Sequence, residues 1–178
     1  MKKLIFVFLF LCLGYVSNAQ NYASSIGLNA GYTQEGFGIL ANYSYYLDRY
    51  SAIHGGIFAS FSNDEFKGEE IPYSLFSFQA GYTRNIWTSR NLKMTAALVG
   101  GGILGYEIIN NGEDELPSGA IITDNSKFIY GIYGGMEIDY LLDEDWSILL
   151  RLNQSYHINS DLGKFTPYVG LGARYFLF

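Results

Sequence analysis

"YVGLGARYFLF", residues 168–178, ends the chain with two interleaved rows of side chains. One row is continuously apolar and consists of Val169, Leu171, Ala173, Tyr175 and Leu177. The other row is mixed and consists of Tyr168, Gly170, Gly172, Arg174 and Phe176. Because successive side chains of a β-strand point to opposite faces, the stretch predicts a strand with one apolar and one mixed face.

The same alternation recurs along most of the chain. It predicts seven further strands, at residues 26–33, 37–46, 53–62, 76–83, 92–108, 128–140 and 146–155. The composition agrees, because 16 Tyr, 13 Phe and 21 Gly accompany only 3 Pro, and aromatic residues favour strands. The sequence therefore predicts an all-β fold.

The connections between these strands alternate in length. Three are short turns, at Leu47–Arg49, within TRNIWTSRNLKM (83–94) and at Leu142–Asp145. Three of the four intervening loops are longer and polar, at Asn63–Pro72, Asn110–Ser126 and Ile158–Lys164. An even number of strands with short turns at one end and long loops at the other is typical of outer-membrane barrels. We therefore expect an eight-stranded antiparallel up-and-down outer-membrane β-barrel, with its N- and C-termini in the periplasm.

Two soluble folds have a similar strand pattern. A lipocalin-like barrel points its apolar face inward to a ligand cavity, and a β-sandwich also alternates apolar and polar residues. Aromatic residues cluster near the predicted strand ends, which favours the interfacial girdle of a membrane barrel. They are Tyr43, Tyr45, Tyr140, Trp146 and Tyr175.

The amino-terminal end predicts export. Lys2 and Lys3 precede an apolar run from Leu4 to Leu13, and Ser17-Asn18-Ala19 supplies a small-x-small cleavage site. A retained membrane anchor is the alternative, but the run is far short of the ~20 residues that span a bilayer. We therefore expect a signal peptide at 1–19 and a β-barrel domain at 20–178.

Cleavage would change the chain's chemistry in two ways. It would remove the sole cysteine, Cys12, so the mature chain would hold no thiol or disulfide. It would also remove two lysines, so the formal net charge of −6 would become −8. Direct nucleic-acid binding is not expected of so acidic a chain, because phosphate neutralisation needs clustered Lys and Arg.

The terminal strand also carries a candidate targeting signal. Gly172, Tyr175 and Leu177 resemble the C-terminal β-signal of outer-membrane proteins, in which a glycine, an aromatic residue and a hydrophobic residue recur at this spacing. The resemblance implies that the barrel insertion machinery binds this strand before it closes the barrel.

A lumen ion pair is predicted between Glu137 and Arg151. The two residues lie at equal distances from the turn centred near Glu144, which places them opposite each other on neighbouring strands. Charges inside a barrel need partners, because an unpaired buried charge is costly. Arg174, Glu107 and Lys93 are candidates to extend this pair into a structural network.

No catalytic, cofactor-binding or metal site is expected. Residues 100–105 satisfy GxGxxG, but a dinucleotide site needs a helix to follow, and here a strand pattern continues. His54 and His157 are the only histidines; His54 faces the predicted lumen, away from any lipid substrate. The acidic clusters at 64–70 and 113–115 lack calcium-loop spacing and indicate solvated loops.

The carboxy-terminal half, residues 75–178, contains a set of scattered positions: Gly105-Tyr106-Glu107, Asn110, Gly112, Phe128-Ile129-Tyr130-Gly131, Leu142-Asp143, Asp161-Leu162, Phe165, Gly170, Gly172 and Arg174. In these positions it resembles the TraO family of Bacteroidetes conjugative transposons. The resemblance implies a non-enzymatic component of a type IV secretion-like DNA transfer apparatus, acting as an anchor or assembly element for partner proteins. The alternative is a generic small outer-membrane barrel of the adhesion or membrane-integrity type.

Overall fold

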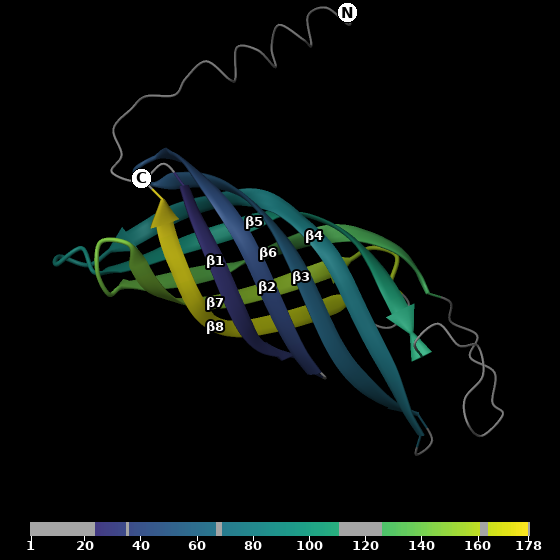
Figure 1. Ribbon diagram of the computed structural model, residues 1–178. Coiled ribbons are helices and arrows are strands. Elements are labelled where there is room, and N and C mark those ends of the chain that lie inside the picture. The colour runs from purple at the N-terminus through teal and green to yellow at the C-terminus, as the bar shows by residue number, and fades with distance from the viewer. Residues whose placement is uncertain (1–23, 35, 67–68, 111–125, 161–163, 178) are drawn as a thin grey trace, which may run out of the picture.

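The computed structural model describes residues 24–34, 36–66, 69–110, 126–160 and 164–177. Eight strands make up nearly all of it (Figure 1). They are β1 Ser24–Thr33, β2 Gly36–Asp48, β3 Ser51–Phe66, β4 Glu69–Thr88, β5 Met94–Ile109, β6 Lys127–Leu141, β7 Trp146–His157 and β8 Phe165–Leu177. The predicted signal peptide, residues 1–19, lies outside the described residues.

Each strand pairs antiparallel with the next, and β8 returns to pair with β1. This closed up-and-down barrel confirms the predicted fold class. The short turns β2–β3, β4–β5 and β6–β7 lie at one end, which we call the turn end, and β1 begins and β8 finishes there (Figure 1). We call the opposite end the loop end. In the described part of the chain, no helix is long and apolar enough to cross a membrane.

The apolar rows of the strands face outward. Leu28, Ile57 and Leu171 are 58%, 64% and 60% exposed, respectively, although they are large aliphatic side chains. The inward rows carry the polar residues, and Arg151, His157, Glu107 and Asn29 are among the most completely buried side chains. A soluble lipocalin-like barrel has the opposite arrangement, so the observed facing matches a barrel that is surrounded by lipid.

The β1–β8 seam closes with little space between the backbones. The two strands are joined by ten consecutive residue pairs, from Ser24↔Leu177 to Thr33↔Tyr168. A Cβ atom added to Gly172 would lie 1.9 Å from the Leu28 carbonyl oxygen. A glycine at this position therefore allows β8 to lie flat against β1.

The lumen is filled in layers. Near the loop end, a cluster of buried apolar side chains fills the cross-section of the lumen. Within it, the Phe58 and Tyr168 ring centroids lie 5.2 Å apart in an edge-to-face arrangement. Its buried members are Leu40, Phe58, Leu75, Ile129 and Tyr168. Glu137, Asp139 and Arg174 lie nearer the turn end, because they occur late in β6 and β8 and both strands finish at that end. Arg151 lies in the first half of β7, which begins at the turn end. Eight-stranded barrels have an interior narrow enough for side chains to fill.

One predicted loop was wrong. Residues 63–66 and 69–72, assigned to a polar loop, pair with each other as the ends of β3 and β4. β2 pairs with β3 only as far as Ser62, and β5 pairs with β4 only from Tyr73, so this hairpin extends past its neighbours as a two-stranded ribbon (Figure 1). A ribbon beyond the rim has no core-facing side, so it does not need the apolar alternation that marks the other strands.

The start of the fifth strand also differs from the prediction. Leu92 lies in the β4–β5 turn with a φ of 59°, and β5 begins at Met94. The loops predicted at Asn110–Ser126 and Ile158–Lys164 agree with the observed strand ends, because β5 finishes at Ile109, β6 begins at Lys127, and β8 begins at Phe165.

Candidate functional site in the barrel lumen

Glu137 and Arg151 occupy opposed positions on β6 and β7. Arg151 Nη1 lies 3.0 Å from Glu137 Oε1, and the two residues are only 1% and 2% exposed, respectively. Both strands follow their alternation without a bulge around the β6–β7 turn, so equal distances from the turn bring the two side chains to the same level of the lumen.

Arg174 joins this pair from β8. Its Nη2 donates to Glu137 Oε2 at 2.7 Å, and its Nη1 donates to Asp139 Oδ2 at 2.5 Å. The Ser147 hydroxyl donates to the other Asp139 oxygen at 2.7 Å. We call Glu137, Asp139, Arg151 and Arg174 the lumen charge cluster; it holds two carboxylates and two guanidinium groups. Charge-assisted contacts of this kind are among the stronger hydrogen bonds in proteins.

Asp139 was missed by the sequence analysis as a member of this cluster. It shares the inward row of β6 with Glu137, two residues away, and that spacing was the available signal. Arg174 was a candidate for this network from the sequence, but no spacing in the sequence indicated that it would contact both carboxylates, because β7 separates β8 from β6.

Glu107 and Lys93, the other two candidates for the network, have different surroundings. Glu107 is fully buried and accepts hydrogen bonds from Tyr73 at 3.2 Å and Ser160 at 2.9 Å, with Lys127 Nζ at 3.9 Å. This second polar group lies toward the loop end. Lys93 is exposed in the β4–β5 turn, at the rim of the turn end.

His54 forms a hydrogen-bonded chain across the lumen. Its Nδ1 atom lies 2.9 Å from the Thr83 hydroxyl, and its Nε2 atom contacts the Tyr133 hydroxyl. All three residues are buried, and the His54 and Tyr133 rings meet edge to face at 5.9 Å. Both ring nitrogens are therefore occupied by neutral hydroxyl groups inside the lumen, an arrangement that suits packing between strands β3, β4 and β6.

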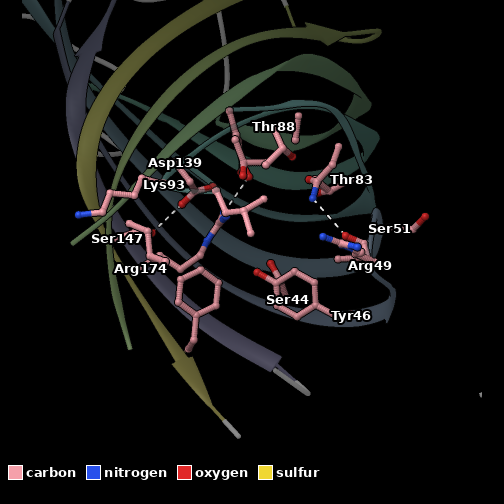
Figure 2. A pocket seen from close by; sticks show the side chains of 18 residues that line it. Ser44, Tyr46, Arg49, Ser51, Thr83, Thr88, Lys93, Asp139, Ser147 and Arg174 are labelled. Atoms are coloured by element: carbon pink, nitrogen blue, oxygen red, sulfur yellow. Dashed lines mark hydrogen bonds and ion pairs between the residues drawn. The ribbon is translucent and has the colours of Figure 1, made fainter. Parts of the chain in front are cut away.

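A cavity of about 520 Å³ lies between the lumen charge cluster and the turn end. We call it the mouth cavity. Figure 2 shows Asp139, Ser147 and Arg174 on one side of it and Arg49, Ser51 and Thr83 on the other. Arg49 and Lys93 line it at the rim, and both belong to the short turns.

The three residues of the predicted insertion signal lie on both faces of β8. Gly172 is on the inward row, whereas Tyr175 and Leu177 are on the outward row, half-buried. Tyr175 stacks obliquely on Trp146 of β7 with ring centroids 4.8 Å apart, and Leu177 is opposite Ser24 at the start of β1. Phe178 lies outside the described residues.

The remaining motifs considered in the sequence are the glycine-rich stretch at 100–105 and the two acidic clusters. Residues 100–105 lie within β5, where they pair with β4 and β6. Among the described residues, no group of three or more His, Cys, Asp or Glu is placed to hold a metal ion. The acidic cluster at 113–115 lies outside the described residues, and the side chains at 64–70 do too.

The outward apolar rows, the closed strand order and the side-chain-filled, charged lumen together define an outer-membrane type of eight-stranded β-barrel. Solved structures agree on this fold. The chain is similar to a major outer membrane protein from Thermus thermophilus, with 14% identity, 89% of this chain and 100% of that chain covered, and a TM-score of 0.61. It is similar to Neisserial surface protein A, with 12% identity, coverage of 88% and 96%, and a TM-score of 0.59. It is also similar to Ail, the attachment invasion locus protein of Yersinia pestis, with 14% identity, coverage of 86% and 96%, and a TM-score of 0.53.

Within this class, the chain belongs to the TraO family of conjugative transposon proteins. The family model, described as conjugative transposon protein TraO, matches residues 19–177. The match covers most of the chain and confirms the resemblance drawn from the carboxy-terminal half. No curated protein matches the chain.

Proposed function

We propose that this chain is a non-enzymatic outer-membrane component of a conjugative DNA transfer apparatus, of the type IV secretion-like kind, and that it acts as an anchor or assembly element. The observation that carries the proposal is the TraO family match over residues 19–177 of a chain that folds as an outer-membrane type of barrel. Family membership supports the process, and the fold supports the compartment.

The filled lumen favours an anchor over a DNA channel. The apolar cluster around Phe58 and Tyr168 occupies the loop-end section, and Glu137 and Arg151 occupy the section nearer the turn end. Eight-stranded barrels leave room for side chains or one small ligand, whereas aqueous channels need barrels of about 16 or more strands. DNA would therefore pass through other components, and this barrel would hold them at the outer membrane.

The proposed orientation places the turn end in the periplasm. Barrels of this class have short periplasmic turns and longer extracellular loops, and the two longest connections here, residues 110–126 and 158–164, both lie at the loop end. In this orientation both termini of the barrel domain face the periplasm. The partners of the barrel would be outer-membrane lipid, the insertion machinery and periplasmic proteins of the transfer apparatus.

Deleting the gene in a donor strain tests the function. Transfer frequency should fall sharply and recover on complementation, while growth and the outer-membrane lipid profile stay unchanged. Unimpaired transfer would remove the conjugation role and favour a generic adhesion or membrane-integrity barrel. Altered lipid acylation would instead indicate an enzyme. An epitope inserted at residues 67–68 and another in the β6–β7 turn test the orientation, because only the first should be accessible to antibody on intact cells.

A further inference from the structure

The mouth cavity has no role in the function proposed above. Several of its lining residues, Ser44, Thr83, Ala97 and Ser147, are buried on the inward rows of the strands. We call its lining residues Glu137, Asp139 and Arg174, which belong to the strands, the floor, and its lining residues Arg49 and Lys93, which belong to the short turns, the rim. All of its lining residues belong to the described part of the chain.

Both carboxylates of the floor, those of Glu137 and Asp139, contact donor groups of other residues of the barrel. Glu137 uses one oxygen for Arg151 and the other for Arg174. Asp139 uses one oxygen for Arg174 and the other for Ser147. The acidic groups of the cavity are therefore already occupied by donors of the barrel itself.

The two basic side chains of the rim, Arg49 and Lys93, differ from the floor residues in their partners. Arg49 and Lys93 form no ion pair with a carboxylate of any described residue, and Arg49 only approaches the face of the Tyr50 ring, at 6.0 Å. Among the lining residues, three cations, Arg49, Lys93 and Arg174, stand against two carboxylates, Glu137 and Asp139, which is an excess of one positive charge. The whole chain carries a net charge of −6. The lining of the mouth cavity therefore carries one net positive charge, whereas the chain as a whole is acidic.

Acidic residues of the neighbouring β6–β7 turn do not cancel this excess within the cavity. Asp143, Glu144 and Asp145 are not among the lining residues. Asp143 accepts hydrogen bonds from the Asp145 and Trp146 amides at 3.0 and 2.7 Å, so its carboxylate is folded back into the turn.

The buried end of the site holds one further unused donor. Arg174 is 6% exposed, and its Nε atom is buried without a hydrogen-bond partner although both terminal nitrogens are paired. Neutral hydroxyl groups of Ser44, Thr88 and Thr95 also line the cavity. A ligand that enters therefore meets cations at the rim and hydrogen-bonding groups below it, which suits a polar, anionic and extended molecule.

We infer that the mouth cavity is a socket for a short acidic peptide segment of a partner protein. The inference rests on the proposed function, since an anchor at the outer membrane needs a contact on its periplasmic side, and it names the chemistry of that contact. Ligand sites of roughly 300–1,000 Å³ bury most of a small ligand, so about 520 Å³ accepts a few residues of an extended chain. Carboxylates of that segment would pair with Arg49 and Lys93 and place backbone groups against the hydroxyls.

The test uses the full mature chain in neutral detergent micelles. The probe is a dye-labelled octapeptide of alternating Asp and Gly, and its counterpart carries Asn in place of Asp. Fluorescence anisotropy should show saturable binding of the acidic peptide that weakens with added salt. Lys93→Glu and Arg49→Glu should each weaken binding about tenfold, because each places a like charge at the rim.

Arg90→Glu is the matched control. Arg90 is exposed in the same turn as Lys93 but does not line the cavity, so it reports the effect of net charge alone. A second variant does not depend on charge reversal: Thr95→Cys, modified with a bulky maleimide, should block the peptide. Arg90→Cys treated in the same way should not. The sole native cysteine lies at position 12, within the predicted signal peptide, so the mature variant would carry a single thiol.

Three results would overturn the socket: equal binding of the Asn peptide, an equal loss in Arg90→Glu and Lys93→Glu, or displacement of the peptide by inorganic phosphate or an oligonucleotide at the same concentration. This experiment is independent of the transfer assay. If gene deletion left conjugation intact while the peptide still bound as described, the conjugation role would fail and the socket would stand. Loss of transfer on deletion with no peptide binding would give the reverse conclusion.

Discussion

Glu137 and Arg151 face each other across the β6–β7 pair with 3.0 Å between Oε1 and Nη1, and both are almost completely buried. The same glutamate binds Arg174 through its other oxygen at 2.7 Å. One carboxylate therefore serves two guanidinium groups at the centre of the lumen charge cluster. Removing it would leave two buried cations close together with only Asp139 to compensate them.

Glu137→Gln should destabilise the barrel strongly. Breaking a buried ion pair by removing one partner costs about 3–5 kcal/mol, because an uncompensated charge remains. Urea unfolding in micelles, followed by tryptophan fluorescence, measures the loss. Glu144→Gln is the control, since Glu144 is exposed in the β6–β7 turn and should change stability little. Equal effects of the two substitutions would show that the lumen charge cluster does not stabilise the fold.

Gly172→Ala should prevent proper closure of the β1–β8 seam. The new Cβ atom would lie 1.9 Å from the Leu28 carbonyl oxygen, so the strands must separate locally. Overpacking of this kind costs at least about 1–3 kcal/mol. Gel migration with and without boiling measures the folded fraction, because a closed barrel stays compact in detergent until it is heated. Gly102→Ala is the control, as its Cβ would have its nearest contact at 4.0 Å.

Tyr175→Ala should lower the amount of barrel inserted in the outer membrane, if β8 carries the proposed insertion signal. The substitution also removes the contact with Trp146, whose ring centroid lies 4.8 Å away. Tyr82→Ala separates the two effects, because Tyr82 is another outward aromatic residue, 45% exposed, outside β8. Outer-membrane fractionation should show a deficit for Tyr175→Ala and not for Tyr82→Ala. A matching deficit in both would assign the effect to lost aromatic area and not to a signal.

His54→Gln should leave conjugation within about twofold of the unchanged chain, because both histidine nitrogens contact hydroxyl groups in the lumen and neither faces lipid. Glutamine keeps polar atoms near Thr83 and Tyr133, which limits the cost of unpaired buried groups. Transfer frequency and outer-membrane lipid composition are measured together. Abolished transfer with a normally folded barrel would assign His54 a chemical role.

Shortening the β3–β4 ribbon should not unfold the barrel. Replacing residues 65–70 with Asn-Gly keeps the pairs Asn63↔Pro72 and Asp64↔Ile71 and provides a favoured two-residue turn. Among the described residues removed, Glu65 pairs with Glu70 and Phe66 with Glu69, and none of them pairs with β2 or β5, so the eight-stranded wall stays closed. Heat-modifiable migration should persist. Its loss would show that the ribbon is needed for folding, and a fall in transfer alone would assign the ribbon a contact with another component.

The sequence by itself determined the contacts between strands that are adjacent in the barrel. Alternation along each strand predicted which row faces outward, and Glu137 and Arg151 were paired from their equal distances to one turn, because antiparallel register carries position directly across a tight turn. The seam with β1 follows from the number of strands, since an even up-and-down set brings the last strand to the same end as the first.

Only the tertiary structure decided the contacts that cross the lumen. Arg174 of β8 reaches Glu137 past β7, and Tyr133 of β6 reaches His54 of β3 although β4 and β5 lie between them in the wall. The mouth cavity, which is lined by residues of several strands and turns, was likewise not predicted from the sequence. The physical reason is that strand tilt and stagger set the level at which each inward side chain lies. Two residues on non-adjacent strands meet only when the whole barrel closes at one particular stagger, and no local pattern in the sequence records that value.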